Sequence, residues 1–497
     1  GRRYVDEPAL AFLSLVNENT FGQAWNAIMS EKVVQKAWYD WVKAERAKDP
    51  TDVPAVLETL PVSKLGYVVA YSAYTDRFQA DLERRMFTRM SGLLRSLGCR
   101  ALLTNQNCGR RGPAMQIVGG DLYDYVDDHF YAPHPELPTG KPRGIYYVPN
   151  CNNATDPEFA VCRAAFARNV AKPFVATEFN FARPANFRGQ GGLLTGAFAG
   201  RQDWSGLWRF AYAHHLACLP DGRGNIGRFD VSVDPLMAAT ERAVLSLFLR
   251  GDMPRLGPAL YIRPSERSIR HPANNQVIPA APKWMTAAWT RRIAVTTSGA
   301  TPSDGPVFDL ADVAGVTKDA PARSPAPEPS DAFLRRDVDK GAFSVDTPGT
   351  KGGFAFAPDR IAVAGFSADV TEAPMTIWVS SLDGKPTEES GRLVLTVLTD
   401  VRGDGQSFAD GDERWLTNWG EWFPEPLIRR GSAKVSLKHL RAGDLRVWAL
   451  DTAGRRVRTV ASEVFPGGLV FDATTVGPDG RGCIAYEIAM GEVPNGK

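Results

Sequence analysis

The sequence predicts an α/β region over about residues 1–300 and an antiparallel β-sandwich over residues 336–497. In the first region short apolar runs alternate with helical segments, which is typical of strand–helix–strand units around a parallel sheet. Residues 301–335 form a linker rich in proline and alanine, containing KDAPARSPAPEPS. Beyond it the helical period disappears, and short alternating runs are separated by Asp-Gly turns.

The α/β region supplies about five strand–helix units. Its first run, residues 9–16 (ALAFLSLV), is apolar throughout and indicates a strand buried on both faces. Further strands are predicted at 100–104, 125–131, 172–177 and 206–212, and helices at 21–46, 74–97, 157–170, 193–201 and 235–250. A closed (β/α)8 TIM barrel has eight such units, so we expect about strands four to eight of one.

The missing strands lead to a further expectation. Five strands cannot close an eight-stranded barrel, and the exposed sheet edges would favour aggregation. We therefore expect an N-terminal polypeptide of roughly 150–250 residues to complete the barrel. The segment between Ala47 and Tyr74 is long for a barrel loop, and we expect it to form a lid or a subunit contact in a homo-oligomer.

The composition excludes several classes of protein. Lys and Arg total 58 and Asp and Glu total 56, which argues against a general electrostatic attraction to nucleic acid. Such a balance is compatible with a neutral carbohydrate ligand. The sequence has no apolar run of about 18 residues, so we expect no membrane span.

The six cysteines of the sequence form no CxxC pair. Cys151 and Cys162 could form a disulfide in a secreted protein, and the alternative is buried or unpaired thiols.

Two glutamates follow directly on predicted buried strands. Glu18 ends the first run and Glu178 ends the run at 172–177. The carboxyl ends of parallel barrel strands meet at one mouth, so both side chains are expected there. Cleavage of a glycosidic bond with retention uses two carboxyl groups, one as acid and one as nucleophile. The structural alternatives are a helix cap for Glu18 and a salt bridge for Glu178.

The residues around both glutamates resemble the motifs of clan A glycoside hydrolases. Asn17-Glu18 is similar to the Asn-Glu pair that ends strand four of that clan. The run KPFVATEF, residues 172–179, resembles strand seven with its terminal nucleophile. The resemblance implies that Glu18 is the acid/base, Glu178 the nucleophile and Asn17 a ligand of the sugar 2-hydroxyl. Alternatively, Asn17 caps a helix.

The same resemblance implies further substrate-binding residues. Its strand six offers a His or Tyr near the nucleophile, which corresponds to His129 and Tyr131, and its strand eight offers an aromatic platform. The predicted members of that platform are Trp204, Trp208 and Tyr212. Asn105 and Asn107 end a strand and could reach the substrate. The alternatives are a buried structural histidine and aromatic rings that fill the core.

Two polar segments remain. The loop with Arg183, Asn186 and Arg188 either touches a distal sugar or is solvated. The Gly-rich turn that starts at Asp400 fails the EF-hand rule, because its twelfth position is Gly411 rather than Glu, and a surface hairpin is the better interpretation.

The leading hypothesis is thus a retaining β-glycosidase or endo-glycanase that works by double displacement with no metal or organic cofactor. Its substrate class suggests a secreted or periplasmic location. The alternative hypothesis is a catalytically silent carbohydrate-binding protein on the same scaffold.

Overall fold

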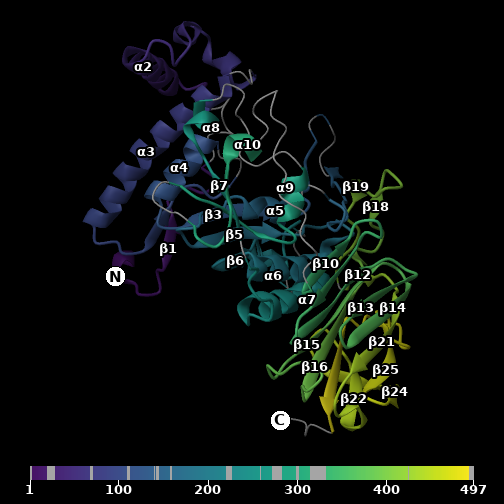
Figure 1. The fold of residues 1–497 in the computed structure, drawn as a ribbon. Coiled ribbons are helices and arrows are strands. Elements are labelled where there is room, and N and C mark those ends of the chain that lie inside the picture. Colours follow the sequence, from purple (N-terminus) through teal and green to yellow (C-terminus); the bar gives the residue numbers. More distant parts are fainter. Residues whose placement is uncertain are drawn as a thin grey trace.

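The computed structural model describes most of the chain. The described residues are 3–19, 28–67, 71–108, 112–138, 140, 145–156, 159–219, 227–257, 259–270, 282–297, 302–313, 332–423 and 425–491. A helical part, a central part with the parallel strands and an antiparallel part follow one another along the molecule (Figure 1).

The helical part is built on α2 (Lys32–Lys48) and α3 (Ser72–Ser96), which are joined by two 3-10 turns at Ala55–Glu58 and Val62–Tyr67. Trp38 and Phe78 pack edge to face with ring centres 5.3 Å apart. Leu57 and Leu65, from the segment expected to form a lid or a subunit contact, are buried in the same core. This segment therefore helps to join the two helices.

Asp76 links α3 to α4 (Pro113–Leu122). Its Oδ2 accepts the Ala114 N–H at 2.9 Å and thereby satisfies one of the free amides at the start of α4. A Cβ at Gly112 would lie 2.0 Å from Asp76 Oδ1, so this approach requires glycine. Burial raises the pKa of Asp76 to about 7, although the backbone hydrogen bonds oppose the shift.

The central part holds parallel strands in three short sheets. The first sheet pairs β1 (Phe12–Ser14) with β2 (Leu102–Thr104). The second has the order β3 (Val126–Tyr131), β5 (Phe174–Asn180), β6 (Gly206–Arg209). The third has the order β8 (Arg292–Val295), β7 (Ala259–Arg263), β9 (Val307–Asp309). The helices of this part are α5 (Ala160–Ala165), α6 (Gly191–Arg201), α7 (Pro235–Val244), α8 (Glu266–Arg270), α9 (Pro282–Ala287) and α10 (Leu310–Val313).

The predicted (β/α)8 TIM barrel is wrong. The parallel strands of the described residues lie in separate sheets of two, three and three strands, and the largest sheet has eight antiparallel strands. The alternation of strands and helices predicts that successive strands pair in parallel. Each such prediction concerns only two strands that are close together in the sequence. Closure additionally requires that each strand bonds both neighbours around a ring, and the sequence pattern does not encode this. The first strand is also shorter than predicted and half-buried, with Val16 39% exposed.

The antiparallel part contains two sheets. The eight-stranded sheet has the order β10 (Leu334–Asp337), β11 (Ala342–Asp346), β12 (Thr350–Ala355), β15 (Met375–Ser381), β16 (Arg392–Leu398), β26 (Ala485–Met490), β22 (Leu445–Leu450), β23 (Arg456–Val460). The five-stranded sheet has the order β13 (Asp359–Val363), β14 (Phe366–Glu372), β21 (Ser432–Lys438), β25 (Gly468–Thr474), β24 (Ser462–Phe465). Shorter pairs are β17 (Val401–Arg402) with β20 (Leu427–Ile428), and β19 (Trp415–Asn418) with β18 (Ser407–Phe408) and β4 (Tyr146–Tyr147).

The central strands of the eight-stranded sheet, β15, β16 and β26, are buried on both faces. On β15, Ile377 and Val379 enter the core shared with the five-stranded sheet, whereas Trp378 enters the core shared with α6 and α7. This follows from the alternation of side chains along a strand. The sheet thus joins the parallel and the antiparallel parts.

The linker predicted at 301–335 is only partly described. Its residues 314–331, which include the run KDAPARSPAPEPS, lie outside the described residues. The described portion includes β9, which pairs with β7, and α10. The third sheet of the central part, which contains β9, therefore extends beyond residue 300.

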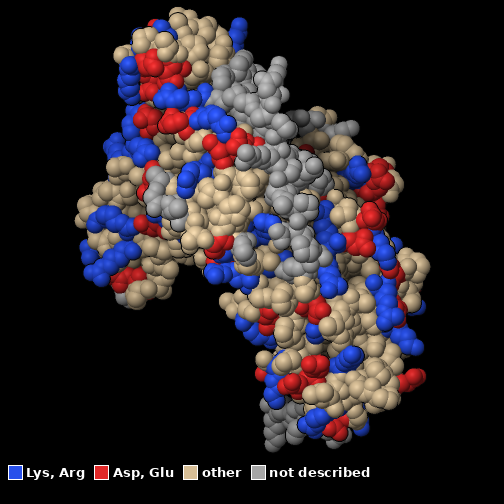
Figure 2. Space-filling view, in the orientation of Figure 1, with Lys and Arg blue, Asp and Glu red and all other residues tan. Residues whose placement is uncertain are grey.

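Two surface features bear on the classes of partner. Basic and acidic side chains are interspersed over the face shown in Figure 2. Among the described residues, no helix combines the length and apolar character that crossing a bilayer requires.

No disulfide joins Cys151, which is exposed, to Cys162, which is buried.

Candidate active site

The carboxyl ends of the short parallel strands bring the two predicted glutamates together. Glu178 lies on β5, directly opposite His129 in the register of β3. Glu18 follows β1 by four residues and adopts a left-handed backbone conformation with φ of 50°. Its N–H donates to Asn107 Oδ1 at 2.6 Å, and Asn107 follows the neighbouring strand β2. Asn107 thereby fixes the turn that presents Glu18.

His129 lies between the two glutamates. Its Nδ1 is 3.1 Å from Glu18 Oε1 and 3.5 Å from Glu178 Oε2. Glu18 Oε1 and Glu178 Oε2 are therefore at most about 6.6 Å apart, which is the sum of these two distances. The imidazole is 1% exposed, whereas the Glu18 and Glu178 side chains are 44% and 15% exposed. Both glutamate side chains are thus partly accessible to solvent, whereas the histidine between them is buried.

Tyr131 holds Glu178 from the next position on the same face of β3. Its hydroxyl donates to Glu178 Oε2 at 2.5 Å, a length typical of a charge-assisted O–H···O⁻ bond. Burial, together with the hydrogen bond to Glu178, raises the pKa of Tyr131. The ring packs against Phe229 and His134 at 5.0 and 5.1 Å between centres. Tyr131 therefore remains a neutral donor fixed on the carboxylate.

A buried chain of hydrogen bonds sets the hydrogen position on His129. Thr177 Oγ1 donates to Asp127 Oδ2 at 2.5 Å, and Asp127 Oδ1 accepts the Thr177 N–H at 3.0 Å. The Thr177 hydroxyl has no second hydrogen, so His129 Nε2, 3.0 Å away, is the donor to it. Burial raises the pKa of Asp127 to about 6, so it is still an ionised acceptor at neutral pH.

This assignment has a consequence for the other ring nitrogen. A neutral His129 with its hydrogen on Nε2 directs the Nδ1 lone pair at Glu18 Oε1. A proton or another cation must then lie between Nδ1 and Oε1, because a lone pair facing a carboxylate is repulsive. Such a proton, carried by either group, or a cation would link the imidazole to the carboxyl group predicted to act as the acid.

Cys108 is a member of the site that the sequence did not identify. Ligand atoms of Glu18, Cys108 and His129 all lie within 4.8 Å of one another. Thr177 and Asp127 were also missed, although they adjoin predicted site residues in the sequence. Since Thr177 precedes Glu178 on β5 and Asp127 lies two positions before His129 on β3, the strand-end rule could have found both.

Several predicted substrate-binding residues have other partners. Asn105 is buried and donates to both carboxylate oxygens of Glu83, at 2.7 and 2.9 Å. Asn17 Oδ1 accepts from Asn107 Nδ2 at 3.1 Å, which leaves its own amide group for a ligand. Trp204 is 5% exposed and packs 5.0 Å from Phe174, so it belongs to the core.

The remaining aromatic residues lie on or after β6. Trp208 is 43% exposed and its ring centre lies 5.1 Å from that of Phe12 on β1. Tyr212 is 64% exposed. Phe210, between them, lies 6.2 Å from the Tyr131 ring. These contacts bring the end of β6 to the site and leave Trp208 and Tyr212 as accessible apolar surfaces.

The loop after Glu178 is structural. Arg188 is fully buried and pairs with Asp234 at 3.0 Å and with Asp400 at 2.7 Å. Asp234 also caps α7, accepting from two of its first amides. Neither the distal sugar contact nor the solvated loop predicted for Arg188 is therefore found, and Asp400 does not belong to an open surface hairpin. This ion-pair network joins the central part to the antiparallel part.

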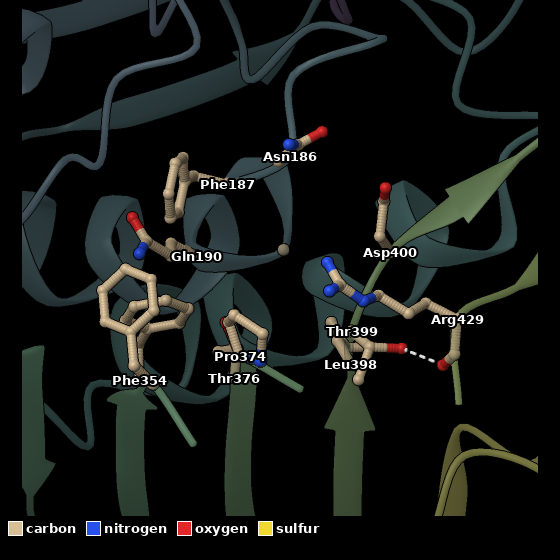
Figure 3. Close-up of a pocket in the computed structure, with 12 residues that line it drawn as sticks. Asn186, Phe187, Gln190, Phe354, Pro374, Thr376, Leu398, Thr399, Asp400 and Arg429 are labelled. Carbon is tan, nitrogen blue, oxygen red and sulfur yellow. Dashed lines mark hydrogen bonds between the residues drawn. The ribbon is translucent and has the colours of Figure 1, made fainter. Parts of the chain in front are cut away.

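A cavity of about 180 Å³ lies beside this network (Figure 3). It is lined by Phe187 and Gln190 from the loop and by Phe354, Thr376 and Leu398 from the eight-stranded sheet. Its lining includes neither Glu18 nor Glu178. The cavity therefore belongs to the contact between the two parts of the molecule.

Comparison of the chain with models of protein families, with curated proteins and with solved structures gave no match.

Proposed function

We propose that the protein is a retaining glycoside hydrolase in which Glu178 is the nucleophile and Glu18 the acid/base. The observation that carries the proposal is the pair of carboxyl groups bridged by one imidazole. Retention requires carboxyl groups about 5–5.5 Å apart, whereas inversion uses about 6.5–9.5 Å to admit a water. The Glu18 Oε1 and Glu178 Oε2 atoms lie no more than about 6.6 Å apart, which is compatible with the shorter separation that retention uses.

The two carboxyl groups divide the reaction between them. Glu18 donates its proton to the glycosidic oxygen while the Glu178 carboxylate attacks the anomeric carbon, and the C–O bond to the leaving group breaks. Water then attacks the glycosyl ester as Glu18 accepts a proton from it, and Glu178 leaves as a carboxylate. Each cycle consumes one water and returns both groups to their initial states. The greater exposure of Glu18 suits a group that exchanges protons with leaving group and water.

The neighbouring residues support this division. The Tyr131 hydroxyl donates to Glu178 and stabilises its charged form, which is the form that attacks. The chain from His129 through Thr177 to Asp127 orients the imidazole so that its Nδ1 faces Glu18, the proposed acid/base. The accessible faces of Trp208 and Tyr212 suit the CH surface of a sugar.

The test is hydrolysis of a panel of aryl β-glycosides by the full chain. We expect release of the aryl group from at least one sugar, with kcat/KM reduced at least about 1,000-fold in Glu178→Gln, because the nucleophile is lost. Glu463→Gln, which alters an exposed glutamate of β24, is the matched control and should retain activity.

The alternative is a carbohydrate-binding protein without turnover. Retained affinity for sugars in both the native chain and Glu178→Gln, with no hydrolysis of aryl glycosides or polysaccharides by either, would refute the enzyme and favour the binder.

A further inference from the structure

We infer that Glu18, Cys108 and His129 form a binding site for a divalent cation of zinc-like softness, and that the bound cation switches off the acid/base group. Binding of the cation stands on the ligand set alone. The inhibition rests on the proposed function, because it requires Glu18 to be the proton donor.

The side chains provide three different ligand atoms in one place. A carboxylate oxygen, the Cys108 sulfur and His129 Nδ1 all lie within 4.8 Å of one another. Zinc bonds of about 2.0–2.3 Å separate the ligands of a tetrahedral site by roughly 3.3–3.8 Å. Glu18 Oε1 and His129 Nδ1 are already 3.1 Å apart. A small movement of the exposed Glu18 or of Cys108 therefore closes the set around an ion.

The electronic state of His129 favours a cation. Its Nε2 is committed to Thr177, so Nδ1 is the ring nitrogen that faces Glu18 and is left to bind an ion. Metal-bound histidines usually donate their other ring N–H to a hydrogen-bond acceptor such as a carboxylate, a backbone carbonyl or a water, which fixes the ring. The chain from His129 Nε2 to Thr177 and Asp127 is an arrangement of that kind. It orients the ring and increases the basicity of Nδ1.

The types of ligand select the class of ion. Sulfur and imidazole nitrogen suit Zn²⁺ and its close analogues, whereas Ca²⁺ and Mg²⁺ require mainly oxygen ligands. A fourth position would be taken by water or by Glu178, whose Oε2 lies 3.5 Å from the same His129 nitrogen. Among the described residues, this is the group of His, Cys, Asp and Glu side chains close enough to share one ion.

Binding of the ion would remove the proton that catalysis uses. The cation occupies the position between His129 Nδ1 and Glu18 Oε1 and takes both as ligands. Glu18 can then neither protonate the leaving oxygen nor accept a proton from water. The site therefore couples turnover to the concentration of free zinc, with cation and proton competing for the same place.

The test combines calorimetry with Zn²⁺ and absorption spectroscopy with Co²⁺ on the metal-stripped full chain. We expect one Zn²⁺ per chain and, with Co²⁺, a near-ultraviolet thiolate charge-transfer band. Loss of an outer-shell partner costs about 10–100-fold in affinity, so Cys108→Ser, which removes a direct ligand, should weaken Zn²⁺ binding by at least about 100-fold. Cys151→Ser removes an exposed thiol outside the group and should change neither signal.

The outcomes separate this inference from the proposed function. No saturable binding, a Co²⁺ spectrum without the thiolate band, or equal affinity in Cys108→Ser and the native chain would overturn the metal site whatever the activity. One bound Zn²⁺ in a chain that hydrolyses no glycoside would instead sustain the site and remove the hydrolase. With an active enzyme, Zn²⁺ at its binding concentration should abolish hydrolysis, and a chelator should restore it. Full activity of the zinc-loaded enzyme would overturn the inhibition.

Discussion

The hydrogen bond from Tyr131 to Glu178 gives a sharp test of the division of roles. In Tyr131→Phe only the hydroxyl is lost, because the ring is held by Phe229 and His134. The lost bond is 2.5 Å long and ends on the carboxylate proposed to attack. Hydrogen bonds to charged groups contribute about 1.5–3 kcal/mol. Since about 1.4 kcal/mol corresponds to a factor of ten, kcat/KM should fall by roughly 10–150-fold.

The assay is the pH dependence of kcat/KM for the best aryl β-glycoside. Besides the fall in rate, the acidic limb should move to higher pH in Tyr131→Phe, because the charged form of the nucleophile loses a donor. Tyr147→Phe is the control: this tyrosine lies on β4, which pairs with β19, and its ring centre lies 4.9 Å from that of Trp415. A Tyr131→Phe enzyme within about twofold of the native rate, with an unmoved acidic limb, would refute the role of Tyr131.

Three further predictions concern positioning and stability. Asn107→Ala should lower kcat/KM about 10-fold or more because the turn that presents Glu18 loses its anchor, and a native rate would contradict this. Arg188→Leu should cost about 3–5 kcal/mol because it removes the buried cation that bridges Asp234 and Asp400; thermal unfolding measures it against Arg441→Leu, an exposed pair for which about 0–1 kcal/mol is expected. The raised pKa of Asp76 means that the fold favours its protonated form. The contribution of this group to the free energy of unfolding is therefore fully present below about pH 4 and is lost as the pH rises through about 7. The loss amounts to about 4 kcal/mol, and Asp76→Asn should abolish it; an identical stability-versus-pH curve in the variant would show that Asp76 contributes nothing.

Much of the candidate site could be predicted because strand ends are a local signal. An apolar run that stops at an acidic residue indicates a carboxyl group at the end of a strand, and this signal predicted Glu18 and Glu178. His129 and Tyr131 were expected only from the resemblance of their segment to the corresponding strand of a known clan. The partners of these groups were harder to predict. Asn105 and Asn107 end the same strand two positions apart, yet one faces Glu83 and the other faces Glu18. The sequence contains no signal for that difference, since it depends on which buried carboxylate lies behind the strand.

The fold could be predicted less completely than the site. The positions of β3, β5 and β6 follow from their apolar character, and their parallel pairing follows from the intervening helices. The barrel was wrong because closure depends on contacts between distant strands. Arg188 illustrates the same limit: its loop is polar in sequence, but both of its acidic partners are more than 40 positions away and the arginine is buried with them.

The central claim is that Glu178 forms a covalent bond to the sugar. The most direct measurement is peptide mass spectrometry after incubation with an activated 2-deoxy-2-fluoro β-glycoside of the sugar that the enzyme hydrolyses best, since fluorine slows release of the intermediate. The account predicts one added sugar per chain, on the peptide that contains Glu178, and none in Glu178→Gln. A label on another residue, or a hydrolysis product with inverted configuration and no label, would contradict it.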